Sequence, residues 1–385
     1  MAHAFNQTSI LKFFTLATGL LALPLTGCGG LPDGPEQDDV ATVQSAINGG
    51  WTTLTPINGW QAAGSTYQAP AVGKVNGVVV FRGALKATNP TSNAAFSLPA
   101  AFAPADQNGF ANSAAVRTKI VLSGGTGGSL TYDYFTHLVS ISQDGLQPSA
   151  IGPASKTFTS LDGASFDVNV GTAVPAPSWD GYYGFRPNPG GVEGFVKNVD
   201  GFVRFQGLLY KTPNDFNNYI FTIPAAYRPG NTVWVYANIG HPSQPNDWST
   251  VTIYPSGEVW VDGTAGATWP SGVHFEGVSF SRTLTGNVAL PLSNGWAAYS
   301  ARLVRVGNYG GVIRFQGAIS GGTSTTIGTL PTTLRPSKTV VLPTISNGTT
   351  ARITITPSGV MTVDNPGGLS VSSSFLSLDG VSFGI

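Results

Sequence analysis

A glycine-bracketed apolar segment occurs three times in this chain, and it constrains the fold more than any other feature. Within each copy a valine or isoleucine and a phenylalanine share one face of an extended strand, because strand side chains alternate faces. The opposite face is mostly polar, which predicts a half-buried strand in an antiparallel sheet. The copies are residues 77–83 (GVVVFRG), 201–207 (GFVRFQG) and 311–317 (GVIRFQG).

Other landmarks recur around these segments in a fixed order. Asn-Gly-Trp precedes the first and third segments, and Arg-Pro follows the second and third. Pro-Ser-Gly, a turn sequence, appears in the second and third copies. An acidic residue followed by glycine comes shortly before the final Ser-Phe of each copy. Landmarks in one order, three times over, indicate tandem copies of a single domain.

We therefore predict an all-β fold of three tandem antiparallel β-sandwich domains of jelly-roll-like type. They cover residues 51–170, 171–283 and 284–385. The chain has 50 glycines and 27 prolines without a collagen period, a composition that suits many short strands joined by tight turns.

The N-terminal residues are typical of a secretory signal. An apolar run over residues 13–25 follows Lys12 and leads into Leu25-Thr26-Gly27-Cys28, which contains the only cysteine of the sequence. These four residues resemble the bacterial lipobox, in which the cysteine is lipidated and the preceding segment is removed. The alternative is an ordinary signal peptide with an incidental cysteine.

The lipobox resemblance implies a lipid anchor on Cys28 after removal of a signal peptide, residues 1–27. Gly29 stands where an aspartate would favour the inner membrane, so the resemblance implies a bacterial outer-membrane lipoprotein, exposed at the cell surface. Residues 28–50 contain two prolines and four acidic residues, and we expect them to form a flexible acidic tether.

The sequence offers few groups for chemistry. The net charge is zero, which argues against a nucleic-acid partner. His137, His241 and His274 have no metal-ligand spacing, and we predict no metal, no cofactor and no enzymatic activity. Asp162 and Asp379 lie in Leu-Asp-Gly, where turn formation explains them more simply than catalysis. A glycosidase would need two carboxylates in one cleft, and this alternative stays open.

The middle copy holds five of the eight tryptophans and seven of the twelve tyrosines. Trp234 and Tyr236 share a strand face, and residues 240–248 read as a polar binding loop that ends on a tryptophan. Exposed aromatic rings are platforms for sugars or protein partners, whereas buried rings would only fill a core. The candidate ligand-binding residues are Trp234, Tyr236, His241, Trp248, Trp260 and Trp269.

Together the landmarks resemble the C-terminal domains of phage tail-fibre and receptor-binding proteins. The third copy matches best, from Asn294 to Phe383. The resemblance implies a compact antiparallel β-sandwich, and because such fibre tips are usually homotrimers it also implies association in threes. We expect the three copies to pack with pseudo-threefold symmetry as an internal trimer within a monomer; beads on a string or a homo-oligomer are the alternatives.

The function expected from these observations is non-enzymatic binding or adhesion at the cell surface. The expected ligand is a glycan or another component of a cell envelope. A structural coat lipoprotein without a specific ligand is the second hypothesis, and a carbohydrate-active hydrolase is the third.

Overall fold

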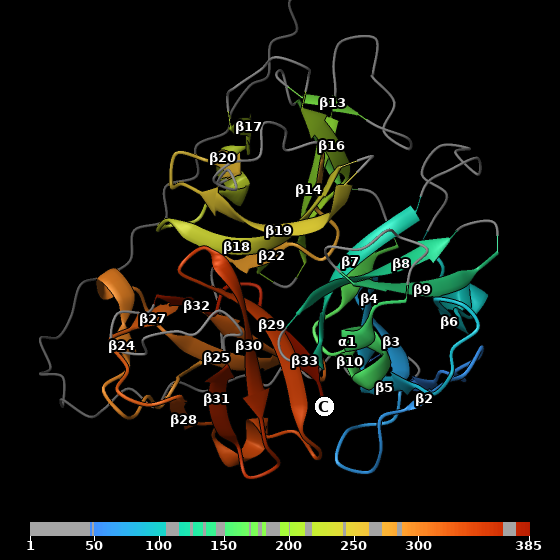
Figure 1. The fold of residues 1–385 in the computed structure, drawn as a ribbon. Coiled ribbons are helices and arrows are strands. Elements are labelled where there is room, and N and C mark those ends of the chain that lie inside the picture. The colour runs from blue at the N-terminus through green and yellow to red at the C-terminus, as the bar shows by residue number, and fades with distance from the viewer. Residues whose placement is uncertain are drawn as a thin grey trace, which may run out of the picture. The chain divides into compact units, whose positions relative to one another are not determined.

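The computed structural model describes residues 47, 50–104, 115–123, 126–133, 136–143, 151–168, 171–175, 179–181, 193–199, 201–211, 218–241, 244–261, 272–282, 287–364 and 375–385. These residues are almost entirely β-structure, and the single α-helix among them is α1 (Pro153–Thr157). The all-β prediction is confirmed (Figure 1). Short 3-10 turns are η1 (Ala100–Phe102), η3 (Ala225–Tyr227), η4 (Tyr299–Ala301) and η5 (Thr332–Leu334).

The described strands form six antiparallel sheets, which fall into three pairs with the same strand order. Each pair consists of a four-stranded and a seven-stranded sheet, whereas a simple jelly roll has eight strands. The four-stranded orders are β1-β3-β4-β11, β12-β14-β15-β22 and β23-β25-β26-β33. The seven-stranded orders are β2-β5-β10-β7-β8-β9-β6, β13-β16-β21-β18-β19-β20-β17 and β24-β27-β32-β29-β30-β31-β28. We call these the first, second and third sheet pairs.

The strand bounds follow the repeat. The first pair has β1 (Thr52–Thr53), β2 (Trp60–Ala62), β3 (Ala71–Val75), β4 (Val78–Arg82), β5 (Ala84–Ala87), β6 (Ala94–Ser97), β7 (Ala115–Leu122), β8 (Gly127–Asp133), β9 (Leu138–Gln143), β10 (Thr159–Ser160) and β11 (Ser165–Asp167). The second has β12 (Thr172–Pro175), β13 (Trp179–Gly181), β14 (Glu193–Val199), β15 (Phe202–Gln206), β16 (Leu208–Lys211), β17 (Tyr219–Thr222), β18 (Val233–His241), β19 (Gln244–Ile253), β20 (Glu258–Val261), β21 (Gly272–His274) and β22 (Ser279–Ser281). The third has β23 (Val288–Ala289), β24 (Ala297–Ala298), β25 (Arg305–Tyr309), β26 (Val312–Gln316), β27 (Ala318–Ser320), β28 (Thr326–Thr329), β29 (Val340–Ser346), β30 (Thr349–Ile355), β31 (Val360–Asp364), β32 (Leu376–Ser377) and β33 (Ser382–Gly384).

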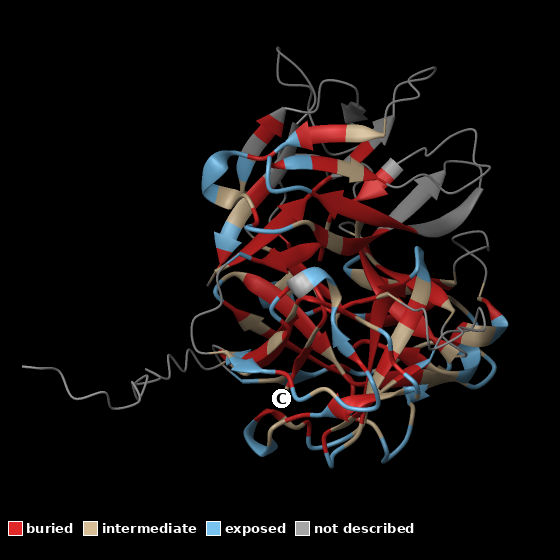
Figure 2. Ribbon diagram, turned by 90° about the vertical axis from the view of Figure 1, so that its left-hand side faces the viewer, coloured by how far each residue is buried: buried red, intermediate tan, exposed pale blue. Residues whose placement is uncertain are grey.

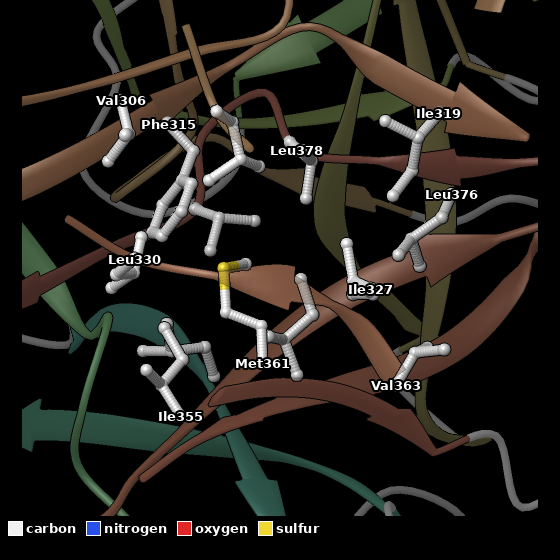
Figure 3. Close-up of a cluster of buried hydrophobic side chains, with 14 of the residues drawn as sticks. Val306, Phe315, Ile319, Ile327, Leu330, Ile355, Met361, Val363, Leu376 and Leu378 are labelled. Carbon is white, nitrogen blue, oxygen red and sulfur yellow. The ribbon is translucent and has the colours of Figure 1, made fainter. Parts of the chain in front are cut away.

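An apolar core lies between the two sheets of each pair. The repeated strands β4, β15 and β26 each contribute their aliphatic residue and their phenylalanine to it. Figure 3 shows the third core, where Phe315 of the four-stranded sheet packs among Ile355, Met361 and Leu378. Burying such side chains stabilises each pair by about 1.5–3 kcal/mol per large residue.

The repeated Arg-Pro has a structural explanation. The arginine donates to the carbonyl of the residue before the preceding proline, from Arg228 Nε to Ile223 O at 3.1 Å and from Arg335 Nε to Leu330 O at 2.9 Å. It also covers the Pro-Ser-Gly turn so closely that a Cβ on the turn glycine would lie 2.6 Å from Nε in both copies. The first copy has neither the Arg-Pro nor the Pro-Ser-Gly sequence, so the arginine and the turn that it covers are either both present or both absent.

Equivalent strands carry the contacts between sheet pairs. β7, β18 and β29 hold the same place in the three seven-stranded sheets, and each contacts the other two. The last strand of each pair contacts the repeated strand of the next, β22 against β26 and β33 against β4. Between the first and second pairs this contact is an ion pair from β11 to β15. These contacts therefore link the three pairs in a cycle.

Hydrogen bonds repeat the same cycle. Ser160 Oγ of the first pair donates to Val341 O of the third at 2.7 Å, and Ser377 Oγ of the third donates to Trp234 O of the second at 2.5 Å. Ser160 and Ser377 are equivalent residues of β10 and β32. His274 takes their position in β21, so the contact from the second pair to the first has a different chemistry.

An arginine lies at each junction, with a different partner each time. Arg204 pairs with Asp167 between the first and second pairs, and Arg314 lies 4.2 Å above the Phe202 ring between the second and third. Between the third and first pairs, Arg82 lies 4.1 Å above the Trp51 ring. Trp51 directly precedes β1, and we call residues 50–51 the N-terminal arm. The Trp51 indole donates to Ile385 O at 3.0 Å, and the arm therefore joins the first strands to the last residue.

The expectation of a half-buried repeated strand is wrong in one respect, because both faces are buried. Val80, Arg204 and Arg314 lie on the face away from the core and are 6%, 3% and 3% exposed. Nearly every residue of these three strands is buried, so this face is covered by other parts of the chain rather than by water. Figure 2 shows buried residues along many of the inner strands.

We expect Asp167→Ala to destabilise the protein by about 3–5 kcal/mol, because it leaves the buried Arg204 guanidinium without its counter-ion. Asp364→Ala is the matched control, since Asp364 pairs with Arg352 at a site where its own side chain is 52% exposed. Its loss should cost about 0–1 kcal/mol. Urea unfolding measures both, and equal midpoint shifts would contradict the role given to the junction.

Candidate ligand-binding surface

A row of directly opposed residues crosses the outer face of the second seven-stranded sheet. Trp234 of β18 is opposite Thr252 of β19, Thr252 is opposite Trp260 of β20, and Trp260 is opposite Tyr219 of β17. Their strand neighbours point into the core, for example the valines on either side of Trp234 and Trp260. The row therefore lies on the face directed away from the four-stranded sheet. We call it the aromatic row.

The corresponding rows of the other pairs contain no aromatic residue. In the third pair the row is Val341, Thr354, Thr362 and Thr326. In the first pair it is Arg117, Thr131, Ser140 and Ala94. The second residue is threonine in all three, whereas tryptophan and tyrosine occur only in the second. The fold that the three pairs share therefore does not require aromatic residues in this row.

Trp260 and Tyr219 form the outer end of the row, on the edge of the sheet. Both are partly exposed, and their rings meet edge to face with centroids 5.7 Å apart and planes inclined by 62°. The Trp260 indole N–H donates to Glu258 Oε2 at 3.4 Å, and the Tyr219 hydroxyl is 2.9 Å from Thr222 Oγ1. These contacts orient both rings and leave a polar rim of a carboxylate and two hydroxyls around them.

Trp234 forms the inner end of the row, at the junction with the third pair. Its ring is edge to face with Tyr299 at 5.8 Å and with Phe375 at 5.0 Å. Arg302 lies 5.5 Å above it and pairs with the buried Asp379. Trp234 stays partly exposed, and the sheet register brings it to the same face as Trp260, with Thr252 between them.

Tyr236 does not belong to this surface. It is 2% exposed, and Lys119 of the first pair covers it, with Nζ donating to Tyr236 O at 3.2 Å and lying 5.0 Å from its ring. Burial, with the nearby Arg204 charge, lowers the pKa of Lys119 to about 7. The expectation that Tyr236 is an exposed platform is therefore wrong, because this face of β18 is covered by β7.

The predicted binding loop at residues 240–248 is largely strand. β18 runs to His241 and β19 begins at Gln244, opposite it, so these residues form a hairpin. The side chains of His241 and Trp248 lie outside the described part of the structure, as do Trp269 and Cys28 entirely. The sequence analysis did not single out Tyr219, Thr252, Thr222 or Glu258, because only the cross-strand register shows that they neighbour Trp260.

The repeated acids have a backbone role rather than only a turn role. Asp162, Glu276 and Asp379 each accept a hydrogen bond from the glycine that closes the repeated strand, Gly83, Gly207 and Gly317, at 2.8, 3.0 and 2.9 Å. Those glycines have positive φ, which a side chain would strain. Burial raises the pKa of Asp162 and of Glu276 to about 7 and also raises that of Asp379.

The described residues contain neither a three-ligand metal cluster nor a membrane-spanning helix. No group of three histidine, cysteine, aspartate or glutamate side chains there is placed to hold a metal ion. Nor does that part of the chain contain a helix with the length and apolar character needed to cross a membrane. Comparison with protein-family models, with curated proteins and with solved structures finds no match.

The buried acid of the second pair makes a pH-dependent contribution that can be isolated. A raised pKa in the folded state means that Glu276 favours folding most below its ordinary value of 4.5 and loses this contribution as the pH rises through about 7. Glu276→Gln keeps an acceptor for the Gly207 N–H but cannot ionise. The free energy of unfolding of the variant relative to the unmodified protein should therefore rise between pH 4.5 and 7, by up to about 1.4 kcal/mol per pH unit. Urea titrations at several pH values test this, and parallel profiles would contradict it.

Proposed function

We propose that this chain is a surface-anchored lipoprotein that binds glycans of a cell envelope without transforming them. The aromatic row carries the proposal, because it places two tryptophans and a tyrosine on one outward face of the second pair alone. Aromatic rings with a polar rim suit sugars, whose C–H faces stack on the ring while their hydroxyls find hydrogen-bonding partners.

The division of roles among the three pairs supports binding over a purely structural coat. Residues at the junctions serve the fold of all three pairs, and most of them are buried, with His274 in place of the serine in the second pair. The aromatic row takes no part in the core of its own pair. At its outer end Trp260 and Tyr219 contact each other, whereas Trp234 contacts Tyr299 of the third pair. A coat protein needs the junctions but has no use for an exposed Trp260.

The proposed catalytic alternative loses support from the repeated acids. Asp162, Glu276 and Asp379 accept hydrogen bonds from backbone N–H groups inside the body. Each is the equivalent of the others in a different pair, so they do not form two carboxylates in one cleft.

Trp260→Thr, which installs the residue of the third row, should weaken glycan binding about thirtyfold, since an aromatic anchor contributes about 2 kcal/mol or more. Thr362→Ala, at the equivalent position of the third pair, is the control and should leave binding unchanged. Binding is read on a glycan array and on whole cells. An unaltered profile for Trp260→Thr would support the structural coat instead.

The anchor is tested at Cys28. In a bacterial host with lipoprotein processing, Cys28→Ser should move the protein from the membrane fraction to the soluble fraction and abolish incorporation of labelled fatty acid, because two or more acyl chains give stable attachment. If the protein with Cys28 intact incorporates no labelled fatty acid, the lipid anchor is ruled out, and the proposal of a glycan-binding site is unaffected.

A further inference from the structure

We propose that the aromatic row binds an extended β-1,4-linked chain of neutral sugars, of the cello- or chito-oligosaccharide class, laid across the strands. This inference rests on the proposed function and specifies its ligand. Three properties of the row carry it: the spacing of the rings, the small residue between them and the charge beside them.

The spacing follows from the sheet. Neighbouring strands are about 4.8 Å apart, and Trp234 and Trp260 lie two strands apart, so their backbones are separated by about 10 Å. The whole row to Tyr219 spans about 14 Å. In a β-1,4-linked chain of equatorial sugars the same face recurs at every second unit, and the chain stays straight and flat. Rings on every second strand match such a chain, whereas an α-1,4-linked chain curls away from a straight row.

Thr252, the residue between the two tryptophans, is small enough for a sugar chain to lie flat across the row. Thr252 faces outward but is only 3% exposed, because neighbouring atoms cover it, so a sugar chain would rest on the indoles rather than on Thr252. Tyr219 then closes the outer end, since its ring is inclined by 62° to Trp260 rather than parallel to it. At about 14 Å, the row is long enough for about three sugar units.

The charge beside the row disfavours acidic sugars. Glu258 is exposed on the same strand face as Trp260, and its carboxylate accepts the indole N–H. A uronate carboxylate on a bound chain would lie near this like charge. Arg302, the cation at the inner end, is 7% exposed and already paired with Asp379, so it offers no compensation. A neutral or amino sugar meets no such penalty.

Calorimetric titration of the whole protein tests the inference with defined oligosaccharides. The series are cello- and chito-oligosaccharides from monosaccharide to hexasaccharide, malto-oligosaccharides of the same lengths, and β-1,4-linked oligomannuronates. We expect affinity to rise up to the trisaccharide and then to level off. The α-linked and uronate series should bind at least about tenfold more weakly than a β-linked neutral chain of equal length.

Three variants separate the contributions. Tyr219→Thr, at the exposed end, should remove the gain from disaccharide to trisaccharide, and Trp234→Val, which installs the third-row residue, should do the same from the other end. Glu258→Gln keeps an acceptor for the Trp260 indole N–H and removes the charge, so it should raise the affinity for oligomannuronate relative to that for neutral chains by several-fold. Urea midpoints verify that each variant is folded.

The outcomes distinguish this inference from the function on which it rests. If some glycan binds in a manner that requires Trp260 but affinity ignores length, linkage and charge, the inference is overturned and the proposed function stands. If neither these oligosaccharides nor any array glycan binds, both are overturned. Preference for cello- over chito-oligosaccharides, or the reverse, identifies the sugar within the supported class.

Discussion

The contact that the rest of the structure depends on is the one that covers the second face of the repeated strand. Each sandwich has its own core, yet the outward face of β4, β15 and β26 carries Val80, Arg204 and Arg314, all nearly inaccessible to water. A buried guanidinium is tolerated only with a partner, and here the partners come from another sheet pair: Asp167 for Arg204 and the Phe202 ring for Arg314. On the same face of β4 as Val80, the half-buried Arg82 lies over the Trp51 ring. The folding of any one sheet pair is thus completed by its neighbour.

The three pairs are equivalent in topology but not in the chemistry of their junctions, and this difference fixes their order. Where β7, β18 and β29 meet, the register places Lys119, Tyr236 and Pro343 at equivalent positions. The Lys119 ammonium is satisfied by the Tyr236 carbonyl, whereas a first pair in the place of the second would put a second ammonium beside it. The closing arm is also unique, because Trp51 needs Gly384, where a Cβ would lie 2.2 Å from the indole. At the other two junctions the residues equivalent to Gly384 are Asp167 and Ser281.

The sequence predicted the strands, because alternation and glycine brackets are local properties. It also predicted the triplication of motifs, and the sheet orders repeat three times. It did not predict that the polar faces are buried, since the alternation of a single strand does not show that another sandwich covers it. The same limit explains why only part of the aromatic row could be predicted from the sequence. Trp260 was recognised as a candidate but Tyr219 and Glu258 were not, because their proximity depends on the register of β17 with β20. Tyr236 was misjudged for the opposite reason, since its outward face meets β7 rather than solvent.

In a chain built in this way, few surfaces can change in sequence without destabilising the fold. The core faces are needed by each sandwich, and the outward faces near β7, β18 and β29 are needed by the junctions. β19 also contacts β8 and β30 of the other pairs, so what remains is the outer edge of each seven-stranded sheet: β9 and β6, β20 and β17, and β31 and β28. The rows differ there most, from Ala94 and Ser140 through Tyr219 and Trp260 to Thr326 and Thr362. Triplication therefore gives three copies of one adaptable surface on a shared scaffold, and the aromatic substitution of a single copy is the change expected when one of them acquires a ligand while the other two preserve the fold.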